Sequence, residues 1–186
     1  MSIRELTIDE FNAFVRNSPL GTHYQTFNYA LLMGENGYEY ELVGMFNEYN
    51  QLKAASLILF KNLKMHYKYG YAPKGFILDY FNQEIVSEFA ALLKNYYKKK
   101  KVVFIKINPE IAISEIDEET GLKTYNWNYN ILGIMEKAGF KKLKDNLGGK
   151  LPEDFIAYLE VIFGGEKDLL LCGDSWYSYG KNFENK

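Results

Sequence analysis

The stretch Tyr-Lys-Tyr-Gly-Tyr-Ala-Pro-Lys-Gly-Phe-Ile-Leu-Asp-Tyr, residues 67–80, decides how the rest of the chain is organised. Its first half alternates aromatic residues with small or basic ones, as in a strand whose two faces meet different surroundings. Pro73 cannot donate a hydrogen bond to a sheet and Gly75 permits a backbone turn, so the strand ends there. We expect this carboxyl end to present free backbone groups and Lys74, where open α/β sheets bind ligands. An ordinary strand-to-helix connection is the simpler alternative.

The composition is that of an ordinary soluble globular protein, with 47% hydrophobic and 25% charged residues in a chain of 186. This length suits one domain or slightly more. Aromatic residues make up 17% of the chain, and the 16 tyrosines suit a cleft of mixed polarity as well as a core. The formal net charge of −2 supplies no global field for nucleic acid. The one basic run, Lys98 to Lys101, is expected to be a solvated helix end rather than a patch for phosphates or anionic lipids.

The sequence favours a cytoplasmic protein. Its single cysteine, Cys172, excludes an intrachain disulfide and fits a reducing compartment. Residues 1–6 lack the apolar segment of a signal peptide. No apolar run approaches the roughly 18 residues of a membrane span.

Hydrophobic periodicity and turn residues predict the secondary structure in chain order. The expected elements are a strand over Ile3–Thr7, a helix over Asp9–Arg16, a short extended piece over Thr22–Gln25, a helix over Phe27–Glu35, a hairpin of strands Glu39–Phe46 and Leu52–Leu63, a third strand beside it in the opening stretch, a helix over Asn82–Lys98 and a buried strand over Val102–Ile107. The long helix is amphipathic, and the residues expected to face inward are Ile85, Phe89, Leu92, Leu93 and Tyr96. The pattern predicts an α/β (α+β) fold with a mixed central sheet flanked by helices.

Four ordered motifs carry a resemblance to a known family. They are Gln-Thr-Phe-Asn-Tyr at 25–29, Asn-Gly-Tyr at 36–38, Tyr-Ala-Pro-Lys-Gly with Leu-Asp-Tyr at 71–80, and Phe-Ile-Lys-Ile-Asn-Pro at 104–109. From about Ile3 to Asn146 the chain resembles the FemA/FemX/MurM (FemAB) family, which are peptidoglycan bridge-forming aminoacyltransferases of the GNAT-like acyltransferase fold. Gly139 to Leu143 also resembles the family's helix-to-strand segment near the close of the first domain.

The resemblance implies a particular reaction. Family members move an amino acid from aminoacyl-tRNA to the amine of a lipid-linked or UDP-linked peptidoglycan precursor, held between two GNAT-like domains. Attack of an amine on an ester requires that both substrates be aligned and that a developing oxyanion be stabilised. The resemblance implies no metal or organic cofactor, with aminoacyl-tRNA as co-substrate, and peripheral contact with a membrane-bound precursor. The alternative is a non-catalytic member of the family, acting as a precursor-binding module or a relic.

The candidate site lies at the end of the opening stretch, and its catalytic residue stays unknown. Six residues are candidates for substrate binding: Lys74, Tyr71, Gly75, Asp79, Gln25 and Tyr29. Lys74 would meet the precursor's phosphates beside backbone donors. Tyr71 and Asp79 would orient a peptide or sugar, and Asp79 could accept a hydrogen bond from an amine nucleophile. As alternatives, Tyr71 belongs to the core and Asp79 caps the helix that begins near Asn82.

Two departures from the family pattern weaken the expected precursor binding. The lysine that meets the diphosphate in the family is matched here by Met33, which cannot bind an anion. An arginine and a proline of the family are Lys74 and Phe76. Lysine keeps the positive charge but lacks the planar fork that binds a phosphate through two bonds.

The third departure concerns residues 147–186. Residues 155–163 and 169–175 are predicted to form a hairpin that resembles strands of the family's second domain, followed by the start of a helix over Ser175–Phe183. We therefore expect a first domain over 1–146 and a partial second-domain remnant over 147–186, which makes the chain a shortened member. The alternative is an extra C-terminal hairpin that completes the sheet of a single domain.

Other kinds of site find little support. The two histidines, His23 and His66, have no ligand spacing and are expected to be packed or solvent-facing. Asp117 to Glu119 precedes Thr-Gly in what we expect to be a solvated acidic turn, not a metal site. Residues 147–150 lack the pattern of a phosphate-binding loop. The Arg/Gln-x-x-Gly-x-Gly/Ala turn of acetyl-CoA-dependent GNAT enzymes is also missing, which argues against a simple acetyltransferase.

Overall fold

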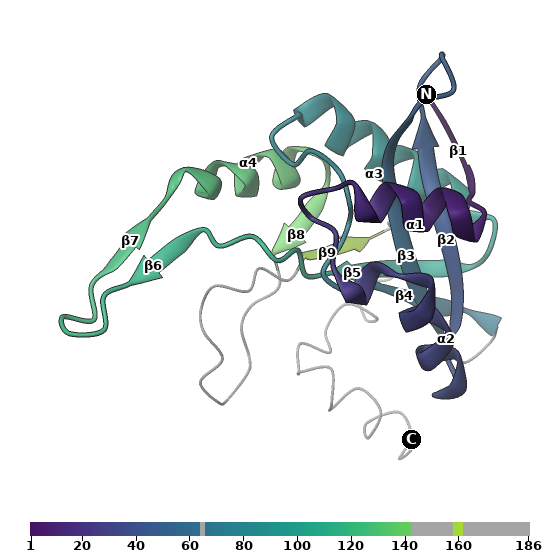
Figure 1. The fold of residues 1–186 in the computed structure, drawn as a ribbon, viewed down its shortest axis with the longest axis horizontal. Helices are drawn as coiled ribbons and strands as arrows, with labels where there is room; N and C mark the ends of the chain where they lie inside the picture. Colours follow the sequence, from purple (N-terminus) through teal and green to yellow (C-terminus); the bar gives the residue numbers. More distant parts are fainter. Residues whose placement is uncertain (64–65, 143–157, 162–186) are drawn as a thin grey trace.

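The computed structural model describes residues 1–63, 66–142 and 158–161, and the architecture below is that of this part (Figure 1). A seven-stranded sheet has the order β1-β2-β3-β4-β5-β9-β8. Its strands are β1 (Ser2–Glu5), β2 (Glu39–Phe46), β3 (Leu52–Asn62), β4 (Lys68–Ala72), β5 (Val102–Ile107), β8 (Phe140–Lys142) and β9 (Tyr158–Val161). Only β4 and β5 are parallel among these pairings. The predicted mixed α/β fold is confirmed.

Helices cover both faces of this sheet. The helices are α1 (Ile8–Arg16), α2 (Phe27–Glu35), α3 (Gln83–Lys98) and α4 (Asn130–Lys137), with short 3-10 helices η1 (His23–Gln25) and η3 (Trp127–Tyr129). One apolar cluster joins α1 and α2 to β2 and β3, and a larger cluster joins α3 and α4 to the opposite face. Ala54 to Phe60 are buried one after another in β3, because the centre of the sheet is covered on both sides.

Most elements agree with the sequence prediction. The bounds of α2, β2 and β5 agree residue for residue, and those of α1, β1, β3 and α3 shift by one or two residues. The opening stretch supplies β4, which pairs antiparallel with β3 as expected. In α3, Phe89 and Leu93 are buried as predicted. The buried residues of α3 also include Val86, Ala90 and Tyr97, whereas the predicted residues Ile85, Leu92 and Tyr96 are only partly buried.

The extended piece predicted over Thr22–Gln25 is wrong, because His23–Gln25 form η1. Two threonines cap this turn: Thr22 accepts a hydrogen bond from the backbone N–H of Tyr24, and the Thr26 hydroxyl donates to the His23 carbonyl. Thr26 also accepts from Tyr29 N and so begins α2. Hydrogen bonds from these two threonines therefore stabilise a 3-10 helix at 23–25, although the hydrophobic pattern of this segment does not predict a helix.

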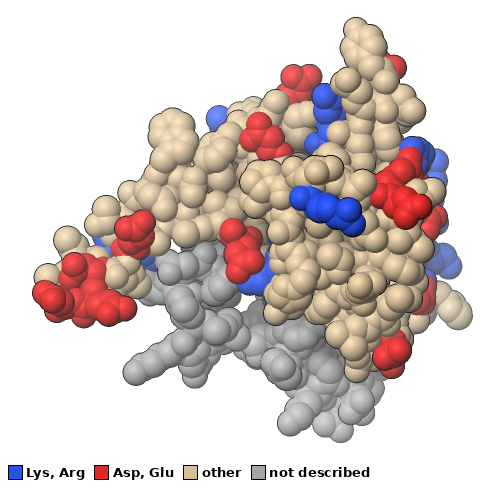
Figure 2. All heavy atoms as spheres, viewed as in Figure 1, with Lys and Arg blue, Asp and Glu red and all other residues tan. Residues whose placement is uncertain are grey.

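A projecting arm is the main unpredicted feature. The strands β6 (Ser114–Ile116) and β7 (Lys123–Tyr125) form a separate two-stranded sheet that leads into η3 and α4 and extends away from the body (Figure 1). Acidic residues gather at its tip (Figure 2), where Asp117 accepts hydrogen bonds from Thr120. The solvated acidic turn is thus confirmed. Lys98 to Lys101 are all exposed, as expected of a helix end.

The C-terminal predictions are only partly within the described residues. β9 lies inside the first strand of the predicted hairpin and pairs antiparallel with both β5 and β8. The second strand over 169–175, the helix over 175–183 and Cys172 lie outside the described residues. The division into 1–146 and 147–186 therefore stays a prediction. No helix in the described part is both long and apolar enough to cross a membrane.

Candidate functional site

The carboxyl ends of β4 and β5 meet at one edge of the sheet because these two strands are parallel. Tyr71 lies opposite Lys106, and Ala72 lies opposite Ile107. Just beyond the strands, the Asn108 side-chain oxygen accepts a hydrogen bond from the Lys74 backbone N–H at 3.0 Å. Asn108 therefore bridges the two strand ends at the place where open sheets bind ligands.

Several backbone groups of the turn after β4 are hydrogen-bonded to other parts of the protein. Besides the Lys74 N–H, the Pro73 carbonyl accepts a hydrogen bond from the Gln25 side chain at 2.7 Å. The Gly75 N–H donates to the Ala72 carbonyl at 3.4 Å. These three backbone groups, which were expected to be free, therefore already have partners.

Gln25 and Gly75 shape the turn from inside. Gln25 is fully buried, and its amide donates to the Leu57 and Pro73 carbonyls and accepts from Leu57 N at 2.8 Å. A Cβ atom on Gly75 would lie 2.8 Å from Gln25 Cδ, so only glycine fits against this amide. These contacts make both residues supports for Lys74. Direct contact of either with a substrate stays a prediction.

Lys74 is held rather than free. Its side chain is 16% exposed, and its ammonium Nζ lies 3.2 Å from the Glu110 carboxylate. The same Nζ lies 5.9 Å from the centre of the Tyr24 ring, within the range of a cation–π contact. An anionic ligand at Lys74 would have to share this ammonium with Glu110.

Tyr71 and Tyr29 are half-buried beside Lys74. Both pack partly against the apolar cluster under α1 and α2, so Tyr71 is at once part of the core and part of the site wall. Burial raises the pKa of Tyr71 to about 12 and also raises the pKa of Tyr29. Their hydroxyls therefore stay protonated at neutral pH, and the Tyr71 hydroxyl shares a hydrogen bond with the Asn108 side chain. The Tyr24 and Tyr29 rings meet edge to face with centroids 5.2 Å apart.

Lys106 is a candidate that the sequence analysis missed, although it lies within the motif at 104–109. It is half-buried on the same sheet face as Tyr71, and burial lowers the pKa of its amine. No carboxylate of the described residues pairs with it. A partly desolvated cation without a counter-charge is costly, which marks it as a functional candidate. In the sequence, Lys106 could have been recognised as the one charged residue within the otherwise apolar strand 102–107.

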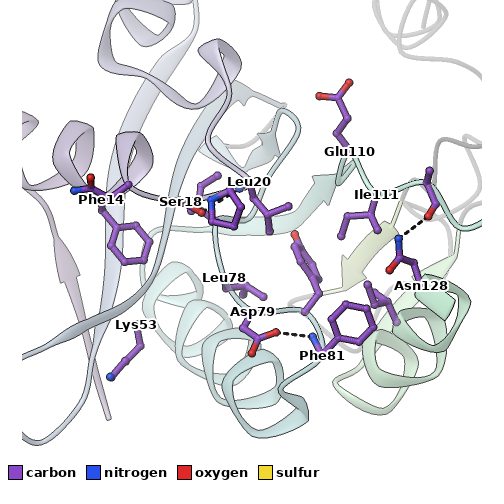
Figure 3. Close-up of a pocket in the computed structure, with 16 residues that line it drawn as sticks. Phe14, Ser18, Leu20, Lys53, Leu78, Asp79, Phe81, Glu110, Ile111 and Asn128 are labelled. Atoms are coloured by element: carbon purple, nitrogen blue, oxygen red, sulfur yellow. Dashed lines mark hydrogen bonds between the residues drawn. The ribbon is translucent and has the colours of Figure 1, made fainter.

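Asp79 lines a neighbouring cavity of about 630 Å³ (Figure 3). A smaller hollow of about 240 Å³ contains Lys74, and the two share walls that include Leu20, Tyr80 and Glu110. Asp79 accepts a hydrogen bond from Phe81 N at 3.0 Å, whereas the cap of α3 is Asn82, whose side chain accepts from Ile85 N. The alternative that Asp79 caps this helix is therefore wrong.

The two histidines lie at the surface, and the His23 ring packs on the Tyr24 ring with centroids 3.9 Å apart. His23 and His66 are exposed, as expected. Among the described residues, no group of three or more His, Cys, Asp or Glu side chains is arranged to hold a metal ion.

The sequence model of the FemAB family matches residues 6–148. The chain belongs to the FemAB family. Aminoacyltransferase FemA from Staphylococcus aureus (strain bovine RF122 / ET3-1) is 31% identical over 147 residues, which are 76% of this chain and 35% of FemA. FemA from strain MW2 has the same identity and coverage. The chain thus spans about a third of the length of these curated relatives, and the predicted extent of the resemblance is confirmed.

Solved structures support the fold of this FemAB chain. A crystal structure of FemX superposes with a TM-score of 0.64 at 24% identity, covering 80% of this chain and 34% of FemX. The aminoglycoside 6'-N-acetyltransferase from Enterococcus faecium gives a TM-score of 0.51 at 13% identity, covering 89% of this chain and 99% of that enzyme. At these identities the likeness concerns the fold, and it confirms the predicted GNAT-like architecture.

Proposed function

We propose that this FemAB chain acts in peptidoglycan bridge synthesis, moving an amino acid from aminoacyl-tRNA to an amine of a lipid-linked or UDP-linked precursor. The observation that carries the proposal is the family match over residues 6–148, together with 31% identity to an aminoacyltransferase. We expect it to act in the cytoplasm, with peripheral membrane contact where the precursor is lipid-linked. The reaction needs no cofactor, because it exchanges one acyl bond for another.

The reaction sets clear demands on the site. The precursor's amine attacks the ester carbonyl of the aminoacyl-tRNA, an amide bond forms, and the ester C–O bond breaks. The tRNA hydroxyl leaves with a proton, and the amine loses one. The protein must align the two substrates and stabilise the oxyanion between these steps. The end of β4 and β5 supports such a role, since Tyr71 and Lys106 lie opposite each other there and the Lys74 ammonium lies near the Tyr24 ring.

Within this site we assign Lys74 to the precursor's phosphates and Tyr71 to a peptide or sugar group. The low exposure of the Lys74 side chain supports this, because a fixed cation loses little conformational freedom on binding. Met33, where the family has a lysine, packs against the apolar cluster and offers no charge. Tyr29 would complete the wall, while Gln25 and Gly75 hold the turn in place.

The connection between β4 and α3 also favours aminoacyl transfer over acetyl-CoA chemistry. It places the Asp79 carboxylate shortly before the first turn of α3, and Asn82 already caps that helix. A negative charge there repels a pyrophosphate, so the helix N-terminus is poorly suited to acetyl-CoA.

A transfer assay tests the proposal. Purified protein is incubated with a mixture of charged tRNAs and muropeptide precursors, and mass spectrometry follows the precursor. We expect an added amino-acid mass, and a loss of at least about tenfold in kcat/KM for Lys74→Ala, in the range of one lost charged contact. Lys137→Ala, at an exposed position of α4, is the matched control. The alternative function, a non-catalytic module that binds the precursor, predicts binding without any mass increase while a longer FemAB protein works in the same tube.

A further inference from the structure

The arm of β6, β7 and η3 (residues 114–129) exposes much apolar surface. Five of its large hydrophobic side chains are between 43% and 75% exposed: Ile116, Leu122, Tyr125, Trp127 and Tyr129. Ring contacts link several of them, since the Tyr125 and Tyr129 rings have centroids 4.6 Å apart and Trp127 stacks on the exposed Phe81. Exposed apolar surface that gathers on one element in this way marks an interaction site.

The two strands of the arm have few contacts that hold them in place. Each has three residues, and within the described part of the chain they pair only with one another. A two-stranded ribbon of this kind is marginally stable in water. Because Ser114 lies opposite Tyr125 and Ile116 lies opposite Lys123, Ile116 and Tyr125 share one face of the ribbon. A second surface that packs on this face would stabilise the arm.

The charge of the arm decides which kind of partner fits it. Acidic residues gather at its tip (Figure 2), where Glu115, Asp117, Glu118 and Glu119 face the single base Lys123. The three glutamates are exposed, and none forms an ion pair with another described residue. This tip repels nucleic acid and anionic lipid headgroups. The arm therefore suits a basic protein surface that is also partly apolar.

The same chain carries such a surface at the end of α3. Lys98 to Lys101 are all exposed, and among the described residues only Lys100 of this run has an ion-pair partner. The Lys101 carbonyl accepts a hydrogen bond from Lys68 N at 3.0 Å, which brings the neighbouring Tyr67, itself exposed, close to the lysine run. Four lysines and an exposed aromatic ring complement the acidic, apolar arm.

The arm and the lysine run cannot meet within one chain. The lysine run precedes β5 and the arm follows it, so the six residues of this strand, or about 20 Å, lie between them. The arm also extends away from the body (Figure 1). In two chains related by a two-fold axis, however, the arm of each chain can lie against the lysine run of the other, and the same contact then occurs twice.

We propose that the arm is a dimerisation element, which packs its apolar face and acidic tip against Lys98 to Lys101 of a second copy of the chain. The inference is independent of the proposed function, because it uses none of the residues assigned to substrate binding. Two equal contacts between unlike charges fix the orientation of the chains and close the assembly at two copies.

Sedimentation equilibrium of the full chain tests this self-association. We expect a monomer–dimer equilibrium whose Kd rises at least about tenfold between about 0.1 M and about 1 M salt, because the screening length falls from roughly 10 Å to roughly 3 Å. A chain that stays monomeric up to roughly 100 µM, or a dimer whose Kd does not change with salt, overturns the proposal.

Charge reversal identifies the two surfaces. One variant carries Glu118→Lys and Glu119→Lys, and the other carries Lys98→Glu and Lys99→Glu, with circular dichroism confirming that each is folded. Either variant alone places like charges opposite one another, so we expect it to be monomeric. An equimolar mixture places unlike charges at both contacts and should form a heterodimer. Parent-like dimerisation of either variant alone, or a mixture that does not assemble, contradicts the inference.

Trp127→Ala tests the apolar part of the contact. Tyr49, in the turn between β2 and β3, supplies the matched control because both side chains are 75% exposed. We expect Trp127→Ala to raise the Kd of the dimer at least about tenfold, as for a large aromatic side chain within an interface. Tyr49→Ala should dimerise as the parent does. Equal Kd values for the two variants would show that the apolar face of the arm is not part of the contact.

Discussion

The half of the sheet around β3 and the half around β4 and β5 can be compared along one row of paired residues. Leu59 on β3 lies opposite Tyr71 on β4, and Tyr71 lies opposite Lys106 on β5, so all three share the face that carries α1 and α2. Leu59 is fully buried under these helices, whereas Tyr71 and Lys106 are only partly buried. Within one sheet and on one face, the position of two helices separates a covered half from a partly open one.

The sequences of the strands reflect this difference. In β3 the one polar residue among Ala54 to Phe60 is Ser56, whose hydroxyl donates to the Leu57 carbonyl. A lysine in that strand would be a buried charge without a partner. In β5 a lysine is tolerated because the face over β4 and β5 is less covered. The covered half thus supports the fold, and the partly open half can hold polar groups that bind or react.

Leu59→Ala should give the largest effect on stability. The change removes a fully buried side chain from the apolar cluster under the helices, so we expect a loss of about 3–4 kcal/mol in the free energy of unfolding. Tyr71→Phe, its neighbour in the row, removes only a hydroxyl and should cost about 1 kcal/mol or less. Urea unfolding measures both, and equal losses would show that the two halves do not differ in burial.

Gln25→Ala tests the link between the two halves. The buried Gln25 amide joins Leu57 on β3 to Pro73 after β4, and its removal leaves three backbone groups without these partners. We expect a loss of about 2–3 kcal/mol, as for buried polar groups that lose a hydrogen bond. Asn28→Ala, at an exposed position on α2, is the control and should change stability by less than about 0.5 kcal/mol. A small effect of Gln25→Ala would mean that the turn is held by other contacts.

The scaffold was predictable because its signals are local. The periodicity within 27–35, 39–46 and 102–107 gave the bounds of α2, β2 and β5 without error. The predictions fail at two places, where polar side chains override the hydrophobic pattern and where the strands are too short to show one. Thr22 and Thr26 cap η1, and the arm of β6 and β7 has too few residues in each strand for periodicity to show.

The candidate site was predictable only in part. Lys74 and Asp79 stood out because Pro73 and Gly75 mark the end of a strand. The supporting role of Gln25 was invisible, since its partners lie 32 and 48 residues away in the chain. Lys106 was missed because its surroundings depend on the pairing of β4 with β5 and on where α1 and α2 lie, which no local pattern specifies.

Lys106→Met tests the partly open half of the sheet. We expect a smaller effect on the free energy of unfolding than for the variants above, and a stabilising one. Burial lowers the pKa of the Lys106 amine below its usual 10.5, so the folded state disfavours the charged form. This penalty is complete below the folded pKa and is relieved as the pH rises through that pKa toward 10.5. We therefore expect the variant to be more stable than the parent at pH 7, with a difference in Tm that shrinks in alkaline buffer. A difference that stays constant with pH would indicate a packing effect alone.

Glu10→Gln concerns the edge of the covered half and should give the smallest effect. Arg4 and the Thr7 backbone N–H hold the pKa of the Glu10 carboxyl at about 2, below its usual 4.5, and Thr7 with Glu10 begins α1. Because the folded pKa is lowered, this stabilisation is present above pH 4.5 and is lost as the pH falls toward 2. The pair is exposed, so the loss in the variant at pH 7 lies in the small range of surface ion pairs. Thermal unfolding from pH 7 to pH 2 should show the parent and the variant converging in acid; if they remained apart at pH 2, the capping geometry of α1 rather than the charge of Glu10 would be responsible.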